Sequence, residues 1–293
     1  MIGGIDIGGT KIEARLFDGL DARTIELRRV PTPLDTFDAL VTQVLAQIAW
    51  LEEISGVDRL PVGVAVPGIV DPVTGLASAA NVPLTGHSLG RALAAHAGRP
   101  IPVVNDCMAF ALSEARGGAG DGERVVVGLV LGTGVGGGIC IDGAVPPRHA
   151  GLAVEIGHVA ASARALSAHC LPLWSCGCGR SGCIERYVSG PGLSAIAEWR
   201  LGKRLPAHEV RDETVLRIWA DVAGDVLAAI HLMLDPDVIV LGGGLSNMEG
   251  IEERLSAGLE RASLEAARKP RILRALHGAS SVARGAALLA APC

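Results

Sequence analysis

The sequence predicts an α/β protein with mixed sheets, built from a duplicated unit. Residues 4–19 read G-I-D-I-G-G-T-K-I-E-A-R-L-F-D-G, and residues 128–143 read G-L-V-L-G-T-G-V-G-G-G-I-C-I-D-G. Aligned without a gap, both begin with glycine, place a glycine after the first apolar stretch and end in Asp-Gly, as a β-hairpin does. Apolar strands alternate with helical patterns after each hairpin. Two unrelated glycine hairpins that converged on one pattern are the alternative.

Composition narrows the class of protein further. The chain has 293 residues, 49% of them hydrophobic, which is enough for two modest domains with their own cores. The formal charge of -5 argues against a general nucleic-acid or anionic-membrane surface. Met1 is followed directly by I-G-G-I-D, without the positively charged start and long apolar core of a signal peptide, and the seven cysteines suit a reducing compartment. We therefore expect a cytoplasmic protein with neither nucleic acid nor membrane as a partner.

In the first half, strands and helices are expected to alternate after the opening hairpin. The predicted elements are a third strand at 24–30, a helix at 36–54, a strand at 61–66, a helix at 88–97, a strand at 101–104 and a helix at 108–116. A glycine cluster at 117–122 is the only break in composition, so we place a domain boundary there.

The second half repeats this order. Residues 125–141 carry no charge, but they contain six glycines and are shorter than the about 20 residues of a membrane span, so they predict two strands. The elements that follow are a helix at 214–234, a strand at 238–241, a glycine turn at 242–244, a helix through 251–267, a strand at 271–275 and a last helix at 282–290. The expected domains are residues 1–118 plus 282–293, and residues 119–281.

Three glycine turns follow apolar strands and are the candidate phosphate-binding elements. Backbone N–H groups of glycine turns can approach phosphate oxygens, and a hydroxyl and a cation add further donors. One turn follows Asp6, which can hold Mg²⁺, and contains one of only three lysines in the chain. Each turn alone could be an ordinary turn. Together they predict one nucleotide site with the residues Asp6, Gly8, Gly9, Thr10, Lys11, Gly132, Thr133, Gly134, Gly136, Gly137, Gly243 and Gly244.

Asn105 and Asp106 end a predicted buried strand and begin a helix. Ligands of α/β proteins collect at the carboxyl ends of strands, where a catalytic carboxylate is useful. The structural alternative is that Asp106 only caps the helix. Asn81, in A-A-N-V-P, is a turn residue by default and a ligand amide if its loop faces a binding site.

A metal site is predicted between residues 155 and 185, in E-I-G-H followed by C-G-C-G-R-S-G-C-I-E. Three thiols and one imidazole form a common tetrahedral zinc set, and glycines let the backbone wrap around an ion. The expected ligands are His158, Cys176, Cys178 and Cys183. Four protein ligands leave no position for a metal-bound water, so the zinc is expected to be structural. Chance proximity and a disulfide are the alternatives.

These motifs together resemble the ROK family of bacterial sugar kinases. The resemblance spans nearly the whole chain and rests on D-I-G-G-T-K, N-D, L-G-T-G-V-G-G-G, E-I-G-H, C-G-C-G-R-S-G-C-I-E and L-G-G-G-L-S-N in this order. It implies an actin-like ATPase fold, with two ribonuclease-H-like lobes around a cleft, and a homodimer. Within the family, A-A-N-V-P and C-G-C-G-R-S-G-C-I-E-R-Y-V-S-G resemble members that phosphorylate N-acetyl-D-glucosamine.

The resemblance also implies roles for residues. It implies transfer of phosphate from ATP with Mg²⁺ to the 6-hydroxyl of the sugar, with Asp106 as general base and structural Zn²⁺ nearby. The implied sugar contacts are Gly68, Asn81, Asn105, Asp106, Glu155, His158 and Glu185. The family's N-D-A-N is N-D-C-M here, so a fructokinase or glucokinase stays an alternative. A sugar-responsive transcriptional regulator is a remote one, because it would carry an N-terminal helix-turn-helix domain before the strand that starts at Ile2.

Overall fold

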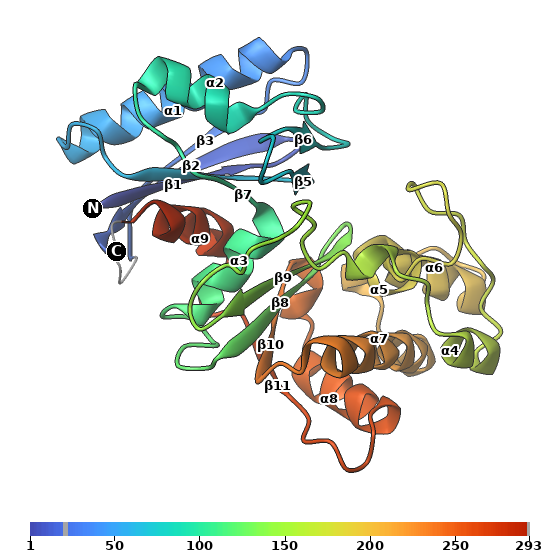
Figure 1. Cartoon of the computed structure of the whole chain (residues 1–293). Helices are drawn as coiled ribbons and strands as arrows, with labels where there is room; N and C mark the ends of the chain where they lie inside the picture. The colour runs from blue at the N-terminus through green and yellow to red at the C-terminus, as the bar shows by residue number, and fades with distance from the viewer. Residues whose placement is uncertain (20–22, 292–293) are drawn as a thin grey trace. The chain divides into compact units, whose positions relative to one another are not determined.

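The computed structural model describes residues 1–19 and 23–291, and its chain divides into two compact units. The first unit comprises Met1–Asp121, Gly138–Ala153 and the chain from Leu276 onward. The second comprises Gly122–Gly137 and Val154–Ala275. Figure 1 labels the elements of both units. Within the described ranges, no helix is long and apolar enough to cross a membrane.

The first unit is organised around a mixed five-stranded sheet. Its strand order is β3-β2-β1-β4-β7. Strands β1 and β2 form the predicted antiparallel hairpin, β2 pairs antiparallel with β3, and β4 and β7 continue the sheet in parallel with β1. The bounds are β1 Ile2–Ile7, β2 Lys11–Asp18, β3 Arg23–Pro31, β4 Val62–Val66 and β7 Val103–Asn105, with a small separate pair β5 Ile69–Val70 and β6 Ala77–Ser78. The expected turn was Asp18-Gly19; residues 20–22, which follow it, lie outside the described ranges.

Helices cover both faces of this sheet (Figure 1). On one face lie α1 (Phe37–Ser55) and α2 (Leu89–Ala97), and on the other lie α3 (Asp106–Ala115) and α9 (Ser281–Ala290). Glycines let α9 contact the strands directly, because a Cβ on Gly4 would lie 1.8 Å from the carbonyl oxygen of Ala283. The C-terminal helix α9 therefore belongs to the first unit.

The second unit contains most of a four-stranded sheet with the order β11-β10-β8-β9. Strands β8 and β11 flank β10, and both run parallel to it. The bounds are β8 Val125–Leu131, β9 Val135–Ile141, β10 Val238–Gly242 and β11 Arg271–Arg274. Strands β8 and β9 take the positions that β1 and β2 take in the first sheet, and β10 and β11 those of β4 and β7. The sheet topology thus repeats, as the two hairpin motifs predicted.

The second unit also carries the longest helix of the described ranges, α7 (Glu213–Leu234), whose N-terminus is capped by Asp212. Trp219 on α7 is fully buried and donates from its indole nitrogen to the carbonyl of Val188. The other helices are α4 Ala163–Ala168, α5 Glu185–Val188, α6 Gly190–Leu201 and α8 Ile251–Ala262, with short 3₁₀ turns η2 Ile156–His158, η3 Ala207–Glu209, η4 Gly244–Asn247 and, in the first unit, η5 Gly278–Ser280.

Some element bounds differ from expectation for local reasons. The strand predicted at 101–104 starts at Val103, since Pro102 has no N–H to donate. Helix α8 ends at Ala262, and Leu264 beyond it is 62% exposed, so a further turn would bury little. Residues 138–153, expected in the second domain, cluster with the first unit. A Cβ on Gly138 would lie 1.9 Å from the carbonyl oxygen of Cys107, which shows how closely this segment approaches α3.

Candidate functional site

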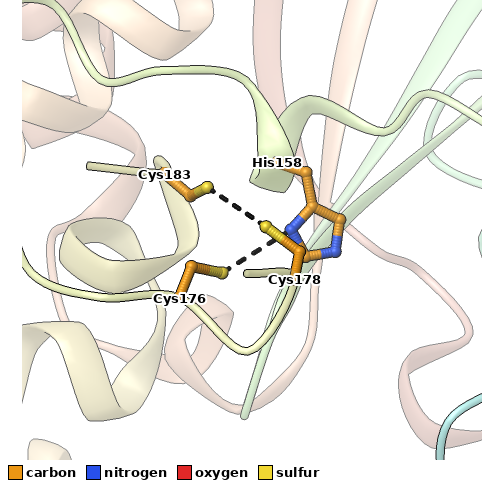
Figure 2. Close-up of side chains that lie close together, drawn as sticks. All are labelled: His158, Cys176, Cys178 and Cys183. Atoms are coloured by element: carbon orange, nitrogen blue, oxygen red, sulfur yellow. Dashed lines mark hydrogen bonds between the residues drawn. The ribbon is translucent and has the colours of Figure 1, made fainter. Parts of the chain in front are cut away.

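The structure brings the four predicted metal ligands of the second unit together. His158, Cys176, Cys178 and Cys183 have ligand atoms that all lie within 4.8 Å of one another (Figure 2). The Sγ of Cys176 is 3.8 Å from Nδ1 of His158, and the Sγ atoms of Cys178 and Cys183 are 3.6 Å apart. Zinc–sulfur bonds of about 2.3 Å in a tetrahedron place ligand atoms about 3.8 Å from each other, so the cluster has the dimensions of a zinc site.

Local backbone structure explains why the cysteines converge. The amide of Cys176 donates to the carbonyl of Arg180, and the amide of Gly179 donates to the carbonyl of Cys176, so the loop closes on itself. Gly179 has a φ of 85°, a conformation that residues with a Cβ rarely adopt. Hydrogen bonds from the backbone N–H and the side chain of Arg180 lower the pKa of the Cys178 thiol to about 6, which favours the thiolate that binds metal.

His158 faces the thiols through Nδ1, which leaves Nε2 on the opposite side of the ring (Figure 2). A metal on Nδ1 would therefore fix the direction in which Nε2 points. Glu155 precedes η2, and its carbonyl accepts the amide of His158 at 3.1 Å. The arrangement can hold a metal and orient a hydrogen-bonding group at the same time.

Glu185 lies beside the β8–β9 glycine turn of the same unit. One of its carboxylate oxygens, Oε2, accepts the amide of Val135 at 3.2 Å. A Cβ on Gly134 would lie 2.6 Å from this oxygen, so a larger residue there would have to displace the Glu185 carboxylate. The two remaining glycines predicted in this turn, Gly136 and Gly137, lie in strand β9.

A cavity of about 1260 Å³ opens next to this turn in the second unit. Gly132 and Thr133 form one part of its wall, and the N-terminus of α6 and the η4 segment form others. Gly244 lines the cavity, whereas Gly243, with φ of 81°, packs against the backbone of Leu131. The wall includes backbone amides, apolar side chains and several arginines.

In the first unit, Asp6 lies near the carboxyl end of β1, and Asn105 and Asp106 lie where β7 passes into α3; β1 and β7 flank β4. Strand pairing places Asp6 opposite Ala65, and the next residue of β4 opposite Asn105. Burial, followed by repulsion from Asp106 and Glu13, raises the pKa of Asp6 to about 7. Two carboxylates that repel each other in a partly buried site would both be stabilised by a cation.

Asn105, and not Asp106, caps helix α3. Its side-chain oxygen accepts the amide of Met108 at 3.1 Å, and its side-chain nitrogen donates to the carbonyl of Gly68 at 2.8 Å. The alternative that Asp106 is the helix cap is therefore wrong. Burial raises the pKa of Asp106, and hydrogen bonds from the backbone and side chain of Cys107 partly offset this rise. The amide of Cys107 donates to Asp106 Oδ1 at 2.8 Å.

The β1–β2 turn contains the other predicted residues of the first unit. The amide of Gly8 donates to the carbonyl of Lys11 at 2.9 Å. Gly9 lies close to Asn81, because a Cβ added to Gly9 would lie 3.2 Å from the Cβ of Asn81. Thr10 is exposed at the tip of the turn. The Lys11 ammonium is 3.4 Å from a carboxylate oxygen of Glu13, so this cation is shared with a neighbouring acid.

Sequence reasoning missed most of the cavity wall in the second unit. The missed residues include Ser194, Arg204, His208, Arg211, Asn247 and Arg254. Only Asn247 falls in a motif, L-G-G-G-L-S-N. The others come from α6, η3, α8 and the loop segments 202–206 and 210–212, which only the fold brings to one place. The capping signal Ser189-Gly-Pro would have located the start of α6.

The chain is similar over nearly its whole length to known sugar kinases. The model of the ROK family matches residues 2–292. The chain is 39% identical over 296 residues to the N-acetylgalactosamine kinase AgaK of Shewanella sp. (strain ANA-3), covering 98% of this chain and 95% of the relative. It is 38% identical over 299 residues to the N-acetyl-D-glucosamine kinase of Escherichia coli O157:H7, covering 98% of each.

The chain is also similar to solved structures of ROK-family sugar kinases. A ROK hexokinase from Thermus thermophilus superposes with a TM-score of 0.83 at 31% identity, covering 98% of this chain and 96% of that one. A ROK glucokinase from Streptomyces griseus, in complex with glucose and AMPPNP, gives a TM-score of 0.80 at 29% identity, covering 98% of each.

Proposed function

Because the chain belongs to the ROK family and is a sugar kinase with the actin-like ATPase fold, we propose that it phosphorylates N-acetyl-D-glucosamine at the 6-hydroxyl with ATP. The observation that carries the substrate class is the similarity, over 98% of the chain, to kinases named for two N-acetylhexosamines. The resemblance in the A-A-N-V-P and cysteine motifs favours N-acetyl-D-glucosamine.

Asp106 is the proposed general base. A sugar hydroxyl is a weak nucleophile, and a carboxylate that accepts its proton assists attack on the γ-phosphoryl group. Burial raises the pKa of Asp106, which makes it a stronger base than an exposed aspartate. Asn105 holds the adjacent backbone through its contact with Gly68, and we propose that these residues and Asn81 bind the sugar.

The nucleotide is proposed to bind in the cavity of the second unit. Its volume of about 1260 Å³ exceeds the about 300–1,000 Å³ of ordinary small-molecule sites. Amides of the turn at Gly132 and Thr133, and of Gly244, can donate to phosphate oxygens, while Leu245 and Val210 offer apolar surface to a base. We propose that Asp6 serves the Mg²⁺ of the nucleotide, since a cation offsets the repulsion that raises its pKa.

The Cys₃His cluster is proposed to hold a structural Zn²⁺. All four positions of a tetrahedral ion are filled by protein atoms, so its chemistry is to fix geometry and not to activate water. In this proposal the ion orients the His158 ring so that Nε2 contacts the sugar, together with Glu155 and Glu185.

Two other substrates are favoured by particular observations. The relative that acts on N-acetylgalactosamine is as similar as the one that acts on N-acetylglucosamine, and the two sugars differ only at the 4-hydroxyl. The hexokinase and glucokinase structures favour a hexose without the acetamido group. Pocket shape, and not the shared motifs, decides among these.

Turnover measurements on a panel of sugars test the proposal. ATP consumption would be followed with N-acetylglucosamine, N-acetylgalactosamine, N-acetylmannosamine, glucose and fructose, each with and without a zinc chelator. We expect the highest kcat/KM with N-acetylglucosamine. A higher kcat/KM with glucose or fructose would overturn the proposed substrate, and no sugar-dependent ATP consumption would overturn the kinase activity. Light scattering in the same preparation would test the homodimer that the family resemblance implies.

A further inference from the structure

The glycine turn that lines the cavity is held by both segments that carry metal ligands. On one side, Gly157, adjacent to the ligand His158, packs so closely on Val135 that a Cβ would lie 2.0 Å from the Val135 carbonyl oxygen. On the other side, Glu185 lies two residues after the ligand Cys183 and accepts the Val135 amide at 3.2 Å. Both segments that carry metal ligands therefore contact Val135, the residue at the end of the glycine turn.

The same turn is fixed to the start of α6, which also lines the cavity. The amide of Gly190 donates to the carbonyl of Gly132 at 2.9 Å. The hydroxyl of Ser189 donates to the carbonyl of Glu185 at 2.7 Å and caps α6. A continuous set of contacts thus runs from the cysteine loop through α5 to Gly132 and Gly190, two residues of the cavity wall.

We propose that Glu185 is a positioning residue for the nucleotide. Its side chain couples the Cys₃His cluster to the glycine turn that ends at Val135, so that bound metal strengthens nucleotide binding and bound nucleotide strengthens metal binding. The inference rests on the proposed nucleotide site. With the metal bound, the path of the chain through Cys183 fixes where α5 starts, and the Glu185 carboxylate holds the Val135 amide. Coupling of this kind is reciprocal by thermodynamic necessity.

The physical basis is the one hydrogen bond from the Val135 amide to the Glu185 side chain. Without this bond, the turn must be ordered when the phosphates bind, which costs binding free energy. Glutamine has a carbonyl oxygen at the same distance along its side chain and can accept the Val135 amide, whereas alanine cannot. The two substitutions therefore separate the hydrogen bond from the charge.

The test is ADP binding by titration calorimetry, without sugar, on the zinc-loaded protein. We expect Glu185→Ala to weaken ADP binding about tenfold and Glu185→Gln to stay within about threefold of wild type. Glu265→Ala, at an exposed position after α8 in the same unit, is the matched control and should bind ADP as the wild type does. Zinc content and thermal melting of each variant confirm that the cluster is loaded and the chain folded.

A second measurement reads the coupling in the other direction. Zinc affinity would be measured by equilibrium competition with a chelator, with and without ADP, and we expect ADP to strengthen zinc binding about tenfold in the wild type but not in Glu185→Ala. Equal ADP affinity in Glu185→Ala and wild type, or equal strengthening of zinc binding in both, would overturn the coupling alone. A wild type that binds no ADP would overturn the proposed nucleotide site as well.

Discussion

The raised pKa of Asp6 predicts that Asp6→Asn flattens the dependence of stability on pH. The ordinary pKa of the carboxyl is 3.8, and burial with repulsion from Asp106 raises it to about 7 in the folded protein. Between these values the folded state keeps a proton that the unfolded state has lost. The stabilising contribution of that proton is complete below the unfolded pKa and disappears as pH rises through the folded pKa.

The magnitude follows from linkage. Each pH unit well between the two pKa values removes about 1.4 kcal/mol from the free energy of unfolding. The loss between pH 5 and pH 7 is about 2 kcal/mol, because the group is already half deprotonated at pH 7. Asparagine has the same shape and no proton to lose, so Asp6→Asn should lack this loss. The variant should therefore gain stability relative to wild type as pH rises, although it should bind the magnesium nucleotide more weakly.

Urea unfolding at pH 5 and pH 7, without Mg²⁺ or nucleotide, measures the effect. The difference in free energy of unfolding between Asp6→Asn and wild type should grow by about 2 kcal/mol between the two pH values. Asp18→Asn is the matched control, because Asp18 is an exposed carboxylate on the neighbouring strand, and it should follow the wild type. A difference between Asp6→Asn and wild type that does not change with pH would refute the reasoning.

Three further predictions concern the reacting groups and the metal. Asp106→Asn should keep sugar binding in calorimetry and lose about 10²- to 10⁴-fold in kcat, and near-normal turnover would remove Asp106 as the base. Cys178→Ser should lose zinc and bind sugar more weakly, and a zinc-free variant with full sugar affinity would contradict the orienting role of the ion. Cys107→Ala removes a thiol donor to Asp106, so the pKa of Asp106 should rise. The acid limb of the pH profile of kcat/KM should then move to higher pH, and an unmoved limb would contradict the contact.

The sequence predicted those parts of the fold that local periodicity determines. The hairpin motifs at Gly4 and Gly128 predicted a repeated topology, because strand alternation and glycine turns are visible within about 16 residues. Helix α6 was missed, since its buried residues include Gly192 and Ser194 and do not form a clear apolar stripe. The assignment of 138–153 to the first unit depends on packing that no local pattern shows.

Distance along the chain explains why the metal ligands could be predicted from the sequence and the cavity could not. The three cysteines lie within eight residues, so their proximity in sequence nearly ensures proximity in space. Arg204, Asn247 and Arg254 meet only because the loop after α6, the η4 segment and α8 surround one cavity. The contact between Glu185 and Val135 likewise joins residues 50 positions apart in the chain.

Product analysis tests the central claim most directly. The chain would be incubated with ATP, Mg²⁺ and N-acetyl-D-glucosamine, and the sugar product identified by phosphorus–proton correlation NMR. We predict one equivalent of ADP for each equivalent of N-acetylglucosamine 6-phosphate. ADP without a phosphorylated sugar, or phosphate on a different hydroxyl, would contradict the proposed reaction.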